Sequence, residues 1–102
     1  MEKETDDRIK RIAFHYGLYP QLEQLQEEGA ELIQAVHKYK RGRELASHIS
    51  CAPPLLEEIA DVEIMIEQIR LLINEDDNSD IERLKDAKLD RQIIRIEHEK
   101  YG

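Results

Sequence analysis

Residues 55–73, LLEEIADVEIMIEQIRLLI, decide the fold, because they describe one long helix whose apolar face carries two acids. At 3.6 residues per turn, that face is made of Leu55, Val62, Met65, Ile69 and Leu72. Glu58 and Asp61 fall within it, three positions apart. Burying an unpaired carboxylate is costly, so these acids predict a compensating cation in the protein interior.

Two further helical segments precede this one, and no stretch shows the alternation of a strand. The first covers residues 4–15, with Thr5 or Asp6 as its cap and Gly17 at its end. The second begins at Pro20 and ends at Gly42. Its predicted core stripe contains Leu22, Leu25, Gly29, Leu32, Val36 and Tyr39. Residues 43–52 have no clear period and predict a loop.

The central helix opens at Pro53 and Pro54 and ends near Asn74, before a last helix over about residues 80–100. The sequence therefore predicts an all-α fold of four helices in a single domain over residues 1–102. The central helix also has a second, weaker apolar strip of Ala60, Ile64 and Leu71. A helix that is apolar on two sides needs neighbours on both sides, so we expect a homodimer or a homotetramer.

Composition excludes several classes of protein. The chain has 23 acidic and 15 basic residues, a net charge of -8, which disfavours nucleic acid as a partner and attracts divalent metal ions. Cys51 is the only cysteine, so a reducing, cytoplasmic setting is expected. The N-terminus is charged and the sequence has no long apolar run. We therefore expect that the chain has neither a signal peptide nor a membrane span.

The second helix carries its own acidic pair, Glu28 and Glu31, again three positions apart and beside the core stripe. If the second and third helices pack antiparallel, four carboxylates converge on a small volume. Oxygen ligands without thiolate, and without histidine at a matching spacing, favour Mg²⁺ or Mn²⁺ over zinc. Taken alone, Glu28 and Glu31 are also explained as a solvated border of the core stripe.

The last helix has three basic residues on one face, Lys88, Arg91 and Arg95. Three interpretations are open for them. They bind phosphate groups, they form salt bridges with Glu58 and Asp61, or they make up a solvated face that pairs with the surplus of acids.

The two acidic pairs form an E-x-x-E motif, Glu28 to Glu31, followed by an E-x-x-D motif, Glu58 to Asp61. This arrangement, within LQEEGAELIQAVHKYKRG and LLEEIADVEIMIEQI, resembles the all-α nucleoside triphosphate pyrophosphohydrolases of the MazG-like group. The resemblance covers roughly residues 21–95 and implies a four-helix MazG-like bundle, oligomeric, of the small phage and bacterial type. It also implies hydrolysis of a nucleoside triphosphate to the monophosphate and pyrophosphate, with Mg²⁺ held by the four acids.

Further roles follow from the resemblance. In the family, basic side chains of the last helix bind the phosphates of the nucleotide. Lys88, with Arg91 or Arg95, lies at the corresponding place in this sequence. Candidates for contact with the nucleotide base are His15, Tyr16 and Lys38, and this chain has no tryptophan, the residue that relatives often stack against the base. From the residues alone, a metal-bound water would attack phosphorus, and Glu28 or Glu31 would accept its proton. The competing hypothesis is a non-catalytic helical module with an interaction or regulatory role.

Overall fold

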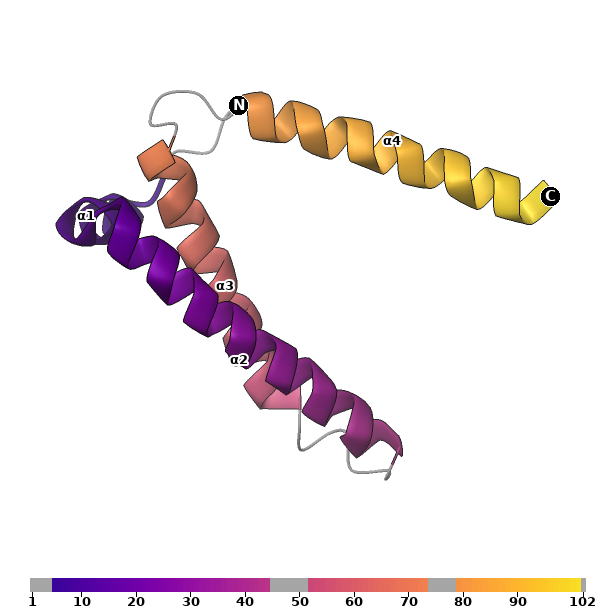
Figure 1. Cartoon of the computed structure of the whole chain (residues 1–102), viewed down its shortest axis with the longest axis horizontal. Coiled ribbons are helices and arrows are strands. Elements are labelled where there is room, and N and C mark those ends of the chain that lie inside the picture. Colours follow the sequence, from indigo (N-terminus) through magenta and orange to yellow (C-terminus); the bar gives the residue numbers. More distant parts are fainter. Residues whose placement is uncertain (1–4, 45–51, 74–78, 102) are drawn as a thin grey trace.

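The computed structural model describes residues 5–44, 52–73 and 79–101, and all its regular structure in these ranges is helical (Figure 1). The four helices are α1 (Asp7–Tyr16), α2 (Leu18–Glu44), α3 (Ala52–Ile73) and α4 (Ser79–Tyr101). The predicted all-α class is confirmed. None of these helices combines the length and apolarity needed to cross a lipid bilayer.

The ends of α1 follow the predicted capping signals. The Asp6 side chain accepts a hydrogen bond of 2.8 Å from the backbone N–H of Arg8 and so satisfies a free donor of the first turn. The Arg8 side chain also binds this carboxylate and lowers the pKa of Asp6 to about 2. Gly17 ends the helix with a φ of 84°, a left-handed conformation that suits glycine, and its N–H donates to the Ala13 carbonyl at 2.9 Å.

Both predicted boundaries of α2 are off by two residues, because the helix begins at Leu18 and ends at Glu44. Pro20 lies in the first turn, where its missing N–H removes no helical hydrogen bond, as predicted. The predicted stop at Gly42 is not used, because the helix continues through this buried glycine to Glu44. Glycine in a helix interior costs only about 1 kcal/mol relative to alanine, so it permits a helix end without forcing one. The predicted loop lies largely at residues 45–51, outside the described residues.

Helices α2 and α3 lie side by side and antiparallel, and α1 packs mainly against α3 (Figure 1). Pro53 and Pro54 occupy the first turn of α3, and the helix ends at Ile73, close to the predicted end. The apolar core between these three helices consists of Ile9, Ala13, Ala35, Met65 and Ile69. The predicted apolar face of α3 is confirmed, since Leu55, Val62 and Leu72 are half-buried beside Met65 and Ile69.

Helix α4 departs from the predicted arrangement. Four helices were expected to close into one bundle, whereas α4 projects away from the other three and packs against none of them within the described ranges (Figure 1). An ion pair of 2.7 Å joins Glu82 of α4 to Arg70 of α3. Five of the large apolar residues of α4 are more than half exposed, namely Leu84, Leu89, Ile93, Ile94 and Ile96. An amphipathic pattern predicts that a face is covered, but it does not say which chain covers it.

Candidate metal site

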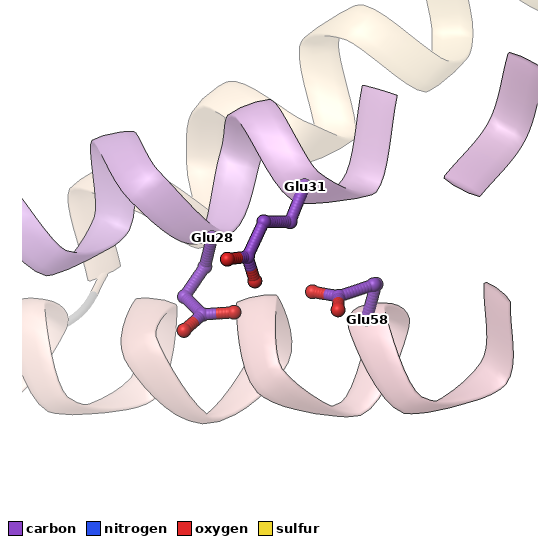
Figure 2. A group of neighbouring side chains, drawn as sticks. All are labelled: Glu28, Glu31 and Glu58. Atoms are coloured by element: carbon purple, nitrogen blue, oxygen red, sulfur yellow. The ribbon is translucent and has the colours of Figure 1, made fainter. Parts of the chain in front are cut away.

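Three of the four predicted acids converge between α2 and α3. Glu28 and Glu31 extend from α2, and Glu58 extends toward them from α3 (Figure 2). One carboxylate oxygen of each residue lies within 4.8 Å of the corresponding oxygens of the other two. We call these three residues the glutamate cluster.

The helical repeat explains why the cluster forms. Residues three apart lie on the same side of a helix, so Glu28 and Glu31 both face α3 at the border of the α2–α3 interface. Glu58 is half-buried on the apolar face of α3, as the sequence predicted. On the preceding turn of α2, the Gln24 side chain donates a hydrogen bond of 2.8 Å to Oε1 of Glu28, which restrains that carboxylate.

The cluster is electrostatically strained. The charge of Glu28 is the main cause that raises the pKa of Glu31 above its usual value of 4.5. Loss of hydration raises the pKa of Glu58, with further contributions from the charges of Glu31 and Glu28. Both side chains therefore resist ionisation when no cation is near.

No protein cation relieves this strain within the described part of the chain. Oε2 of Glu28 and Oε2 of Glu58 are buried and accept no hydrogen bond. The ion pairs found among the described residues join other side chains, in α1, in α4 and between α3 and α4. The sequence also allowed a salt bridge from Lys88, Arg91 or Arg95 to Glu58 and Asp61. Among these described residues, the single chain does not form this salt bridge.

Asp61 does not occupy its predicted position in the core. Its side chain is exposed, and it is not one of the three acids whose oxygens converge. Three residues of helix turn the side chain by about 300°, so Asp61 points about 60° away from Glu58, which is enough to place it beyond the edge of the buried face. Asp61 is still near enough to act at a distance, because its charge helps to raise the pKa values of Glu31 and Glu58.

The predicted phosphate-binding residues lie apart from the cluster in the single chain. Lys88, Arg91 and Arg95 are exposed on α4, which does not pack against α2 or α3. Lys38 is exposed on α2, two helical turns beyond Glu31. Within the described part of one chain, no basic side chain of α4 therefore lies near the glutamate cluster.

The residues at the end of α1 that were predicted to contact the nucleotide base lie near a cavity. His15 packs edge-to-face against Tyr16, with ring centroids 4.6 Å apart. Tyr16 borders a cavity between α1, α2 and α3, which also contains two glutamines that the sequence reasoning missed. Gln21 and Gln68 are 4% and 1% exposed, so they are among the most buried side chains of the protein. Both continue an apolar stripe, the same signal that revealed Glu58.

The chemistry of the glutamate cluster fits a hard divalent cation. It offers only carboxylate oxygens, two of them buried and without a partner, and carries a surplus of negative charge. Mg²⁺ and Mn²⁺ take such ligands and complete their coordination with water or phosphate oxygens. Comparison of this chain with protein-family models, curated proteins and solved structures gives no match.

Proposed function

We propose that the protein is a Mg²⁺-dependent nucleoside triphosphate pyrophosphohydrolase, which releases pyrophosphate and leaves the monophosphate. The observation that carries the proposal is the convergence of Glu28, Glu31 and Glu58 with no protein cation among them. The order of the two acidic motifs, which resembles that of the MazG-like enzymes, supplies the substrate class. Mn²⁺ is the expected substitute for Mg²⁺.

The four acids have two kinds of role in this proposal. Glu28, Glu31 and Glu58 hold the cation, and the exposed Asp61 adds negative charge at the edge of the site. A bound Mg²⁺ neutralises charge on phosphate oxygens and lowers the pKa of its water ligands. Glu31 is the exposed member of the glutamate cluster, so its carboxylate is the one best placed to accept a proton from an attacking water.

A triphosphate also needs positive charge from the protein, and here we propose that a second copy of the chain supplies it. The apolar residues Leu84, Leu89, Ile93, Ile94 and Ile96 of α4 are more than half exposed, and Ile64 in the second apolar strip of α3 is 42% exposed. Exposed apolar surface of this kind marks a site of protein–protein contact when it is contiguous. A homodimer or homotetramer that covers these residues can carry Lys88, Arg91 or Arg95 of one copy toward the acids of another. Those bases would stabilise the leaving pyrophosphate.

We expect the purified protein to form such an oligomer. Light scattering coupled to size exclusion should give at least twice the 12.0 kDa mass of one chain. Replacing Leu89 and Ile93 together with aspartate should lower that mass, because both residues lie in the exposed apolar strip of α4. The control is Gln92→Asp, which adds a negative charge to α4 at an exposed polar position outside the apolar strip. It should leave the mass unchanged. A monomeric wild-type protein would contradict the proposed assembly.

We expect pyrophosphate release from at least one ribonucleoside or deoxynucleoside triphosphate in the presence of Mg²⁺ or Mn²⁺. The assay is a panel of the eight common triphosphates, with chromatography to show that monophosphate and pyrophosphate form in equal amounts. Excess chelator should stop the reaction. Turnover of none of the eight, by an oligomeric protein that binds Mg²⁺, would instead support the non-catalytic regulatory module.

A further inference from the structure

The cavity between α1, α2 and α3 has a volume of about 590 Å³, within the range of small-molecule sites. Apolar side chains form part of its wall, including Ile12 of α1 and Met65 of α3. Its polar wall consists mainly of carboxamides and carboxylates, from Gln21, Gln24 and Gln68 with Glu23 and Glu27. Neither lysine nor arginine is among the described residues that line it, so its chemistry does not suit a phosphate group.

The most buried side chain in this wall is incompletely bonded. Gln68 is 1% exposed, and its Nε2 donates to Oε1 of Gln21 at 2.5 Å and lies 3.6 Å from the sulfur of Met65. Its own Oε1 is buried and accepts no hydrogen bond. An unsatisfied buried acceptor destabilises the protein, and a ligand that donates a hydrogen bond to it removes that cost.

The cavity adjoins the glutamate cluster along the α2–α3 interface. Gln24 lines the cavity, and its side chain donates to Glu28 of the cluster. Gln21 pairs with Gln68 and Glu31 lies beside Glu58, so the two helices keep one antiparallel register over ten residues. Ten residues of helix correspond to about 15 Å, a length that an extended nucleotide covers between its base and its terminal phosphates.

The balance of donors and acceptors indicates which part of a nucleotide fits. The acceptors of the lining residues include the carboxylates of Glu23 and Glu27 and, just beneath the surface of the wall, the buried and unpartnered Oε1 of Gln68. An exocyclic amino group presents two donor hydrogens to such a wall, whereas uracil and thymine present a single ring N–H flanked by two keto oxygens, which the acceptors repel. Tyr16 at the edge of the cavity offers an aromatic surface for the ring.

We propose that this cavity binds the nucleotide base and that Gln68 selects bases with an exocyclic amino group, such as cytosine and adenine, over uracil and thymine. The proposal rests on the proposed function for the kind of ligand. It assigns base selection to Gln68 and Gln21, in place of the His15 and Lys38 predicted from the sequence.

Nucleosides without phosphates, in the absence of divalent metal, test this proposal separately from turnover. In ¹H–¹⁵N spectra, deoxycytidine and deoxyadenosine should shift the side-chain amide signals of Gln68 and Gln21 and bind about tenfold more tightly than deoxyuridine and thymidine. Gln68→Met, which keeps the length of the side chain, should remove that preference. Gln26→Met, at an exposed position of α2 outside the cavity, should keep it.

Three results would overturn the proposal. The first two concern the wild-type protein and do not depend on whether a variant folds: equal binding of amino and keto nucleosides, or binding that leaves the two glutamine signals unchanged. The third is a Gln68→Met protein that retains the preference. Nucleoside binding without turnover of any triphosphate would contradict the proposed function alone, and turnover without cavity binding would contradict this inference alone.

Discussion

The Glu58→Gln protein should lose pyrophosphohydrolase activity by more than about 100-fold, because it loses a ligand of the proposed Mg²⁺. The change preserves the shape of a half-buried side chain while it removes the charge. Its fold should persist, since the wild-type carboxylate is poorly hydrated and repelled by Glu31 and Glu28. The measurement is the steady-state rate on whichever triphosphate the wild-type protein hydrolyses best, at several Mg²⁺ concentrations.

The matched control is Glu63→Gln, which removes one negative charge from an exposed position of the same helix. It should keep the rate within about twofold, because surface charges away from special features have small effects. A Glu58→Gln protein as active as Glu63→Gln would show that the glutamate cluster does not carry the reaction.

Mg²⁺ should stabilise the folded protein, and the glutamate cluster should be responsible for the effect. At an Mg²⁺ concentration of 100 times its Kd, ligand linkage contributes about 2.7 kcal/mol. For a domain of this size, that corresponds to an increase in Tm on the order of 10 °C. Glu31→Gln should abolish most of the increase and raise the Tm of the metal-free protein, since its charge opposes those of Glu28 and Glu58.

The pH dependence of the metal-free protein should have a definite sign. The pKa values of Glu31 and Glu58 are raised in the folded state above the usual 4.5, so the folded protein binds more protons than the unfolded chain in the range just above pH 4.5. Their contribution therefore makes the protein more stable as the pH falls from neutral toward 4.5. Asp6 and Glu82, whose pKa values are lowered by Arg8 and Arg70, act in the opposite direction at lower pH.

Mg²⁺ binds the ionised acids, so the Tm increase that it causes should shrink over the same pH range. Calorimetric scans with and without Mg²⁺ between pH 7 and pH 5 measure both effects. Glu63→Gln should behave as the wild-type protein does. A Tm that is independent of Mg²⁺ at neutral pH would count against a cation site in the folded protein.

The helices and part of the site could be predicted from the sequence because local rules determine them. The cap at Asp6, the end at Gly17 and the start at Pro53 and Pro54 each depend on neighbouring residues. The approach of Glu28 and Glu31 to Glu58 follows from spacing on two helices and from their antiparallel packing. The helical pattern thus carries enough information to bring three acids together.

The rest depends on contacts that the pattern does not encode. Asp61 and Glu58 lie on the same predicted face, yet only Glu58 is half-buried, because the rotation of about 60° between them moves Asp61 across the edge of the interface. The pairing of Gln68 with Gln21 joins residues 47 positions apart. The position of α4 depends on which surface covers its apolar strip. The sequence pattern of the strip is the same whether that surface belongs to the same chain or to another chain, so the pattern does not predict the position.

The most direct test of the central claim, that Glu28, Glu31 and Glu58 bind a divalent cation, is a crystal structure of the protein grown with Mn²⁺ and measured near the manganese absorption edge. We expect an anomalous peak between α2 and α3, within bonding distance of a carboxylate oxygen from each of the three glutamates. Ordered carboxylates that point into solvent, or that contact arginine side chains with no anomalous peak among them, would contradict the claim.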